Sequence, residues 1–234
     1  MRFTILAAEW NAKLVALAKV MNSKVALPIY STFLLELKDG VLRITASDMD
    51  CSRCSTLPVM DMDRANEHNG SLCVTASFLL DSLKNLGDQP VTFEADEENL
   101  SVVIRYNNGQ FDMVGFPAKD YALPGTMGKS VQVTIEASVL NDSIGKSLYA
   151  VGNDDLRPIF SGIYFTKKGD ELQCATTNGS MLVRNTYKVE NDGQEYSFLL
   201  HSRAAKIVRS MTSKSDEKVQ VFITEPVSYT HLRA

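Results

Sequence analysis

The stretch Leu27-Pro28-Ile29-Tyr30-Ser31 decides the fold, because it returns later in the chain, without a gap, as Arg157-Pro158-Ile159-Phe160-Ser161. Further matches flank it at the same offset in numbering. Phe3-Thr4-Ile5 returns as Val133-Thr134-Ile135, and residues 35–45 return as residues 165–175. In both copies of that last segment, alternating apolar residues flank a turn of Lys, Asp and Gly, which predicts a β-hairpin. Self-similarity at a fixed spacing predicts two related structural units.

Each copy combines strands with two amphipathic helices. The apolar spacing predicts helices over residues 9–22, 76–87, 137–151 and 201–214, with Ser77 and Ser202 as caps near two of the starts. At a slightly shorter offset, residues 76–80 and 91–93 return as residues 201–205 and 219–221. The first copy continues through two more strands, at 100–106 and 110–116. The predicted fold class is therefore α+β, with pairs of helices packed on antiparallel sheets.

The repeat also predicts the domain boundaries. We expect a first domain over residues 1–123, a linker at 124–128 and a second domain over 129–234. After Val219–Thr224 the second copy should contain another hairpin, and the sequence stops instead. The sequence therefore predicts a fragment with an incomplete second domain. The segment from about Pro226 departs from the matching part of the first copy, which raises the question whether it is native sequence.

Composition excludes several classes of protein. Of the 234 residues, 44% are hydrophobic and 22% are charged, which are ordinary values for a folded globular chain. A net charge of −4 argues against a protein that coats DNA or anionic membranes through bulk charge. The apolar run near the N-terminus is broken by Glu9, and no apolar stretch approaches the roughly 20 residues of a membrane span. We expect a soluble, cytoplasmic protein that does not bind membranes.

The charges are nevertheless sorted along the chain. The four helical segments, with the first extended to Lys24, carry nine basic and three acidic residues, a net charge of +6, so the remainder carries −10. A protein that faces phosphate with one side, and repels it elsewhere, needs such sorting. Surface helices also carry Lys for solubility, and the charge pattern alone leaves both interpretations open.

The sequence offers little for catalysis. Its three histidines are scattered, and it contains no nucleophile elbow, Walker loop or dinucleotide fingerprint. A cluster of carboxylates invites comparison with a divalent-ion site; its members are Asp48, Asp50, Asp61 and Asp63. An Asp-rich loop at strand ends is more often a solvated turn than an ion site. We therefore expect no enzymatic activity, no metal and no cofactor.

Cys51 and Cys54 form a Cys-x-x-Cys pair, which occurs in zinc sites and in redox proteins. No second Cys or His pair stands at zinc-site spacing, and the setting is not thioredoxin-like. The structural interpretation is favoured, in which all four cysteines are free thiols in a reducing compartment.

Several strings, taken in their order and spacing, give the chain a family likeness. They are Met1–Ile5, Ala26–Ile29, Phe116–Tyr121, Asp155–Ile163 and Ala175–Leu182. With these strings the chain resembles the bacterial DNA sliding clamp, the beta subunit of the replicative DNA polymerase III holoenzyme. Members of that family have three such domains per chain and close head to tail as dimers into a six-domain ring. The resemblance covers the first domain and most of the second.

The resemblance implies a mechanism of encirclement, with helices lining the hole of the ring and sheets forming its outer wall. Weak, sequence-blind contacts to phosphates would let the ring move along duplex DNA. Lys24 and Arg203 match basic family positions that contact DNA. Placement on the predicted helices adds Lys13, Lys84, Lys146 and Lys206 as candidates.

The resemblance also implies a pocket for short peptide motifs of the polymerase III catalytic subunit, the clamp loader and other clamp-binding proteins. The matching positions are Arg157, Phe160, Thr177, Gly179 and Leu182. Many family members carry a charged Asp-Gly-His-Arg string where this chain has Asn178-Gly179-Ser180-Met181, so its peptide preference is expected to differ. Without the resemblance, Phe160 and Leu182 would be interpreted as core residues.

Phe111 matches an apolar position of the subunit interface in the family, and the third domain of a partner chain would face it. Without a third domain we expect Phe111 to be an exposed hydrophobic residue, and we do not expect this chain alone to close a ring. A second hypothesis stays open at this point. The chain would then be a clamp-fold interaction module, or an accessory clamp, that does not close a ring.

Overall fold

A computed structural model describes residues 1–21, 27–60, 69–123, 130–152, 157–213 and 217–224. Contacts between its residues divide the chain into two compact units, Met1–Gly125 and Thr126–Ala234. The predicted linker at 124–128 lies outside the described residues. No helix of the described residues is long and apolar enough to cross a membrane.

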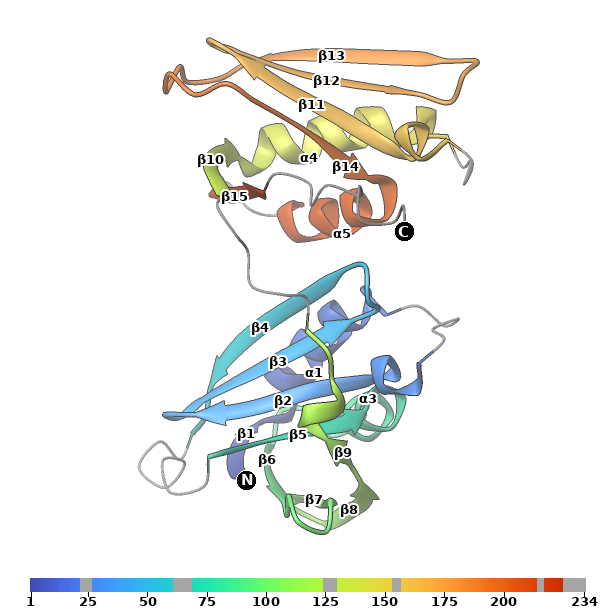
Figure 1. The fold of residues 1–234 in the computed structure, drawn as a ribbon. Helices are drawn as coiled ribbons and strands as arrows, with labels where there is room; N and C mark the ends of the chain where they lie inside the picture. Colours follow the sequence, from blue (N-terminus) through green and yellow to red (C-terminus); the bar gives the residue numbers. More distant parts are fainter. Residues whose placement is uncertain (22–26, 61–68, 124–129, 153–156, 214–216, 225–234) are drawn as a thin grey trace. The chain divides into compact units, whose positions relative to one another are not determined.

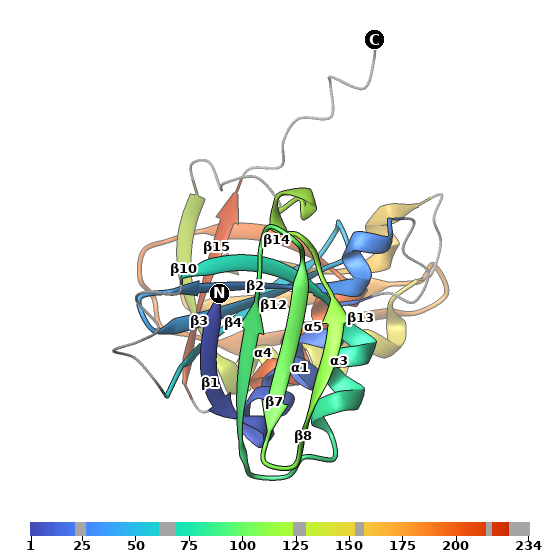
Figure 2. The same ribbon diagram turned by 90° about the horizontal axis from the view of Figure 1, so that it is seen from below.

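The first unit contains two antiparallel sheets (Figures 1 and 2). One sheet has the strand order β1-β6-β7-β8, formed by Arg2–Leu6, Pro90–Ala95, Ser101–Tyr106 and Gly109–Val114. The other has the order β4-β3-β2-β5-β9, formed by Ser52–Pro58, Val41–Ser47, Thr32–Lys38, Gly70–Thr75 and Phe116–Pro117. Asp39 and Gly40 turn the chain between β2 and β3 with φ angles of 50° and 73°, as the favoured two-residue hairpin turn requires.

Helices α1 (Ala7–Ala18) and α3 (Ala76–Leu83) contact each other and pack on the sheets of the first unit. The apolar stripe of α1, which the sequence predicted from Leu14 and Leu17, is buried. Trp10 adds a fully buried indole ring whose edge meets the rings of Phe3 and Phe93 at centroid distances of 5.4 and 5.8 Å. The strands β1 and β6 are thereby fixed to α1 through one aromatic cluster.

The second unit repeats this plan with fewer strands in one sheet. Its larger sheet has the order β13-β12-β11-β14, formed by Leu182–Lys188, Glu171–Thr177, Gly162–Lys168 and Tyr196–His201. Its smaller sheet pairs β10 (Ser130–Glu136) with β15 (Lys218–Thr224). Helices α4 (Ala137–Ser147) and α5 (Ser202–Thr212) lie side by side on one face of the larger sheet (Figure 1). In the described residues the smaller sheet lacks counterparts of β7 and β8.

The repeat predicted from the sequence is present in the structure. The short 3₁₀ helices η1 (Pro28–Ser31) and η5 (Pro158–Ser161) coincide under the offset found in the sequence. The same offset carries both ends of β2, β3 and β4 onto the ends of β11, β12 and β13. The α+β fold class is therefore confirmed, and the equivalence of the two units is accurate to the residue over this block.

One predicted equivalence is wrong by one residue. The sequence aligned Ala76 with His201, whereas strand register aligns Thr75 with His201, because these residues pair with Thr32 and Gly162 respectively. The predicted equivalence of Val91 with Val219 is correct, since they pair with Ile5 and Ile135.

The predicted caps are also wrong. Ser77 is the second residue of α3 and Ser202 is the first residue of α5, so neither precedes its helix. The cause is a shared construction in which β1, β5, β10 and β14 each run into a helix without a loop. The last strand residue therefore occupies the N-cap position. At α5 this residue is His201, whose Nδ1 accepts a hydrogen bond of 3.3 Å from the backbone N–H of Arg203.

Candidate functional site

The predicted DNA-contacting residues lie on or at the ends of the helices, with one exception. Lys24 lies outside the described residues. Lys13 is on α1, Lys84 follows the last turn of α3, Lys146 is on α4, and Arg203 and Lys206 are on α5. In each unit the described candidates therefore lie on the layer that its two helices form. The side chains differ in how their charge is compensated.

Two of the five described cations are paired with an acid of their own helix. Lys84 Nζ lies 2.8 Å from Asp81 Oδ1, and Lys146 Nζ lies 2.6 Å from Asp142 Oδ2. The hydrogen bond from Lys146 lowers the pKa of Asp142, and a second bond of 2.9 Å from the Tyr187 hydroxyl acts in the same direction. Each of these ion pairs compensates part of the lysine charge within its own helix.

Lys13 and Lys206 differ from Lys84 and Lys146. Both side chains are exposed, and within the described residues neither forms an ion pair. Arg203 is half-buried at the start of α5. Among the predicted candidates, Lys13 in the first unit and Lys206 in the second therefore carry the least compensated charge.

Arg209 is a candidate that the sequence analysis did not single out. It is exposed on α5, and its guanidinium lies over Gly145 of α4, where an added Cβ would come within 3.1 Å of it. The backbone oxygen of Arg209 accepts a hydrogen bond of 2.9 Å from the Asn141 side chain. The sequence signal for this contact was Gly145, inside the apolar pattern of α4, since a residue without a side chain lets the Arg209 side chain approach closely.

Arg157 and Phe160 of the predicted peptide pocket are brought together at η5. The guanidinium of Arg157 lies 5.0 Å from the centroid of the Phe160 ring, which is cation–π geometry. Gly152 packs against this pair: its N–H donates a 2.8 Å bond to the Phe160 oxygen. A Cβ at Gly152 would come within 3.1 Å of Phe160 and 3.5 Å of Asn178. The absent side chain of Gly152 thus lets Phe160 and the turn at Asn178 approach each other.

The predicted residues Thr177, Gly179 and Leu182 lie on the turn between β12 and β13. The Thr177 hydroxyl donates a 2.6 Å bond to the Met181 oxygen and accepts one of 3.1 Å from the Gly179 N–H. Gly179 has a φ of +90°, which a residue with a side chain rarely adopts. Leu182 follows and is 74% exposed, so the interpretation as a core residue does not apply to it. The turn therefore presents an apolar residue beside a rigid polar loop.

The expectation that Phe111 is exposed is wrong. Phe111 is half-buried on β8, stacked on Tyr106 at a centroid distance of 5.0 Å and edge-on to Phe78 at 6.5 Å. Tyr106 comes from β7, the strand before β8 in the predicted hairpin, and Phe78 comes from α3, which the sequence did not place beside β8. Around them lies an open hollow of about 550 Å³, which includes Phe78, Leu86 and Phe111.

The carboxylate cluster does not form an ion site in the described residues. Asp48 is 7% exposed and its Oδ1 accepts a 2.9 Å bond from the Cys51 N–H, so it shapes the turn between β3 and β4, in which Asp50 is exposed. Asp61 and Asp63 lie outside the described residues. Among the residues the structure describes, no group of three or more His, Cys, Asp or Glu side chains could hold a metal ion. Cys51 and Cys54 are free thiols, as are Cys73 and Cys174.

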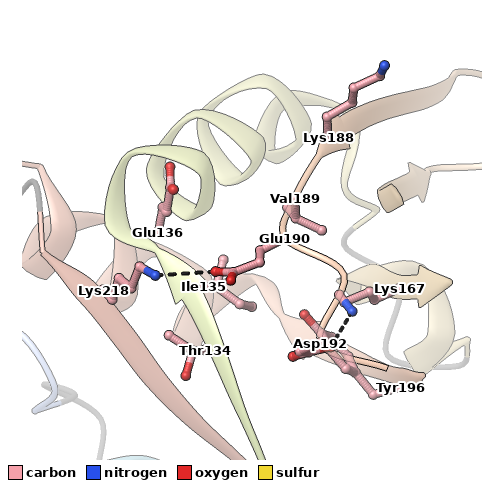
Figure 3. A pocket seen from close by; sticks show the side chains of 10 residues that line it. All are labelled: Thr134, Ile135, Glu136, Lys167, Lys188, Val189, Glu190, Asp192, Tyr196 and Lys218. Atoms are coloured by element: carbon pink, nitrogen blue, oxygen red, sulfur yellow. Dashed lines mark hydrogen bonds and ion pairs between the residues drawn. The ribbon is translucent and has the colours of Figure 1, made fainter. Parts of the chain in front are cut away.

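A polar pocket of about 370 Å³ in the second unit was not predicted (Figure 3). Lys167 of β11 points into it with only 4% of its side chain exposed, and Nζ lies 2.6 Å from Asp192 Oδ1 and 3.0 Å from the Gln194 oxygen. The bond from Lys167 lowers the pKa of Asp192. At the other side of the pocket, Lys218 Nζ is 3.5 Å from Glu190 Oε2.

Comparisons with known proteins match both units to known domain models. Residues 1–124 match the family model described as the N-terminal domain of the DNA polymerase III beta subunit, and residues 134–233 match the model of its central domain. A beta sliding clamp of Staphylococcus epidermidis is 23% identical over 225 residues, which are 95% of this chain and 59% of the relative. That of Staphylococcus aureus is 22% identical over the same shares.

Solved structures show the same fold. A sliding clamp of Bacillus subtilis superposes with a TM-score of 0.87 at 22% identity, and one of Pseudomonas aeruginosa, bound to griselimycin, with 0.86 at 20% identity. Each comparison covers 96% of this chain and 60% of the solved chain. The chain thus spans about 59% of the length of the curated relatives it matches.

Proposed function

Because this chain belongs to the DNA polymerase III beta-subunit family, we propose that it supplies two domains of a DNA sliding clamp. The clamp is a non-catalytic ring that encircles duplex DNA and keeps the replicative polymerase on its template. Encirclement replaces tight binding, so the contacts to DNA are weak, mobile and independent of base sequence.

The observation that carries this proposal is the repeated helical layer with its cations. Each unit presents two adjacent helices, and each pair includes at least one exposed lysine without an ion pair in the described residues, Lys13 or Lys206. In the proposed ring these layers face the DNA, and Lys24 and Arg203 contribute further contacts. Isolated lysines on helices suit sliding, since each contacts a phosphate briefly and none reads a base edge.

The proposed partners follow from the two other predicted surfaces. Peptide motifs of the polymerase III catalytic subunit, the clamp loader and other clamp-binding proteins would dock at Arg157, Phe160, Thr177, Gly179 and Leu182, where cation, aromatic ring and exposed leucine adjoin a rigid turn. A homodimer would form through the first unit near the hollow at Phe111. We place the protein in the cytoplasm, where replication occurs in bacteria.

Retention on DNA tests the function. A full-length clamp that contains these two domains is loaded on nicked circular plasmid, and its retention is measured by gel filtration before and after the circle is cut. We expect retention to be lost on linearisation, because the ring slides off the ends. Equal retention on circular and linear DNA would contradict encirclement, and no retention on either would favour an interaction module that does not close a ring.

A further inference from the structure

The two helices of each unit meet along a seam, and two positions at this seam differ together between the units (Figure 1). Gly145 of α4 is equivalent to Val15 of α1, because both helices begin directly after equivalent strands, with the offset found for the repeat. Arg209 of α5 is equivalent to Leu83 of α3, because the strands before these helices end at the same register position. A valine and a leucine in the first unit are thus replaced by a glycine and an arginine in the second.

The exchange places a charge where the first unit has a buried hydrocarbon side chain. Leu83 belongs to the apolar core of the first unit and is 1% exposed. Arg209 is exposed instead, and its guanidinium lies across α4, where a Cβ on Gly145 would come within 3.1 Å of Nη2 and 3.3 Å of Nε. Position 145 therefore leaves the room that the arginine side chain occupies, and a larger residue there would force the guanidinium to move.

The backbone at Arg209 is also fixed to α4. The Asn141 side chain donates hydrogen bonds of 2.9 Å to the Arg209 oxygen and 3.1 Å to the Thr212 hydroxyl. Asn141 precedes Gly145 by four residues, so the two lie one turn apart on the same face of α4. The seam thus holds the arginine backbone at one turn of α4 and accommodates its side chain at the next.

Arg209 does not lie on the side of α5 that corresponds to the contact between α3 and β8 in the first unit. There β8 meets α3 at Phe78, whose ring is edge-on to that of Phe111. The counterpart of Phe78 on α5 is Ala204, which precedes Arg209 by five residues. Five residues place two side chains about 140° apart around a helix. The guanidinium therefore faces α4 and solvent, away from the position that a strand equivalent to β8 would take.

Helix α5 is the most cationic of the described helices. Each of α1, α3 and α4 contains an acidic residue, whereas α5 contains three basic residues and no acid. Lys206 and Arg209 are exposed and lie about one turn apart on the same side of α5. Neither forms an ion pair with another residue that the structure describes. Both charges are therefore available to an anion outside the chain.

We propose that Arg209 is a further contact to the phosphates of duplex DNA and that Gly145 is its positioning residue. The inference rests on the proposed function, because it requires the helical layer to face the DNA. A guanidinium donates two parallel hydrogen bonds to one phosphate, which an ammonium does not. The contact reads no base and so is compatible with sliding. The second unit then contributes one phosphate contact that the first unit, with Leu83 at this position, does not.

The test measures binding of a fluorescein-labelled duplex by a full-length clamp that contains these domains, between about 50 and 200 mM salt. Arg209→Ala should reduce the slope of log K against log salt by about 0.9, the value for one phosphate contact, and weaken binding about tenfold at the lowest salt. Arg184→Ala is the matched control. Arg184 lies on the face of β13 opposite the helices, since Tyr187, three residues later, bonds to α4. Its loss should leave the slope unchanged.

Gly145→Val tests the positioning role, because it gives the seam the residue that the first unit has there. It should weaken DNA binding about threefold or more in the wild-type background and have no further effect in Arg209→Ala, since it acts through the arginine. Ser138→Val is the control, because it adds the same side chain at an exposed position of α4 and should leave binding unchanged. Circular dichroism and the urea midpoint establish that each variant is folded.

Two results would overturn this inference alone. A wild-type salt slope in Arg209→Ala would mean that Arg209 contacts no phosphate. Equal weakening by Gly145→Val with and without the arginine would mean that Gly145 does not position Arg209. The absence of any salt-dependent DNA binding by the wild-type clamp would instead overturn the proposed function, and this inference with it.

Discussion

Lys167 occupies the position in β11 that Leu37 holds in β2, the equivalent strand of the first unit. Leu37 is part of the apolar core, and Lys167 is 3% exposed. Burial of a lysine is unfavourable unless its charge is paired and hydrogen-bonded. Here Asp192 and the Gln194 oxygen supply the partners from the loop that follows β13. In the first unit the segment after β4 is held to β1 differently, by a 2.9 Å hydrogen bond from the Met60 N–H to the Thr4 oxygen.

The Lys167–Asp192 pair predicts an effect of Asp192→Asn on stability. The variant should unfold at lower denaturant concentration near pH 7, because the buried ammonium loses its charged partner while Asp192 itself is 38% exposed. Lys167→Met is the matched control, since it removes the buried charge along with its need for a partner. Its stability should stay within about 1 kcal/mol of the wild type or exceed it. A large loss in Lys167→Met with none in Asp192→Asn would contradict this account.

The same pair predicts a pH dependence with a defined sign. The pKa of Asp192 is lowered in the folded protein by its hydrogen bond to Lys167. The stabilisation is therefore fully present above the unfolded pKa of about 3.9 and is lost as pH falls through the folded value. The difference in urea midpoint between wild type and Asp192→Asn should be constant from pH 5 to 7 and shrink below about pH 4. A difference that instead grows on acidification would be inconsistent with this pair.

The sequence alone could have identified Lys167 as a lysine on the buried face of its strand. Ile163, Phe165 and Lys167 alternate on one face of a strand, so the lysine was an evident exception to the period-2 pattern. The hairpin was inferred from its turn, and the lysine was assigned to that turn. The partners Asp192 and Gln194 lie beyond two further strands of the chain, on an irregular loop, and no periodicity connects them to Lys167.

At the scale of elements, the direct junction of strand and helix explains which boundaries were predictable. Helix interiors were predicted well from Leu14, Leu17, Leu79 and Leu83, which are buried. The starts of α3 and α4 were also predicted correctly, at Ala76 and Ala137, and those of α1 and α5 were wrong by two residues and by one. The predicted caps were wrong, because strand residues such as His201 take the cap position. Helix ends were predicted too late: α3 ends at Leu83 instead of residue 87, and α4 gives way at Leu148 to the 3₁₀ helix η4 (Leu148–Ala150).

The helices predict a ranking of the candidate DNA contacts. In a full-length clamp containing these domains, Lys13→Ala and Lys206→Ala should each reduce the slope of log K against log salt by about 0.9, the value for one phosphate contact. Lys84→Ala and Lys146→Ala are matched controls with the same change of net charge, and they should alter the slope less, because Asp81 and Asp142 already compensate those lysines. Binding is measured by anisotropy of a labelled duplex between about 50 and 200 mM salt. Equal effects of all four substitutions would refute the ranking.

At the scale of the whole chain, the internal repeat was the most informative sequence signal. It predicted the fold class, and family models matching residues 1–124 and 134–233 confirm the resemblance built on it. The repeat did not predict the surfaces at which the two units differ. The pocket at Lys167 depends on which loop residues close it, and a one-dimensional alignment of equivalent residues does not contain that information.

The two units also predict unfolding in two steps. Among the described residues, the main apolar core of the first unit contains 24 buried residues and that of the second contains nine. Since burial of apolar area is the main stabilising term, the second unit should unfold first. Trp10 is the single tryptophan and lies in the first core. In urea, far-ultraviolet ellipticity should therefore fall at lower concentration than tryptophan emission changes. Coincident transitions would mean that the chain unfolds as one cooperative unit.

The block from η1 to β4 and the block from η5 to β13 contain the same number of residues, so one could replace the other without changing the length of the chain. Such an exchange would still not be neutral. Moved into the second unit, the first block would bring Leu37 opposite Asp192 and remove the salt link that holds its loop. Moved into the first unit, the second block would bury an ammonium in a hydrocarbon interior. The duplicated halves have thus diverged into parts that share a backbone and are no longer interchangeable.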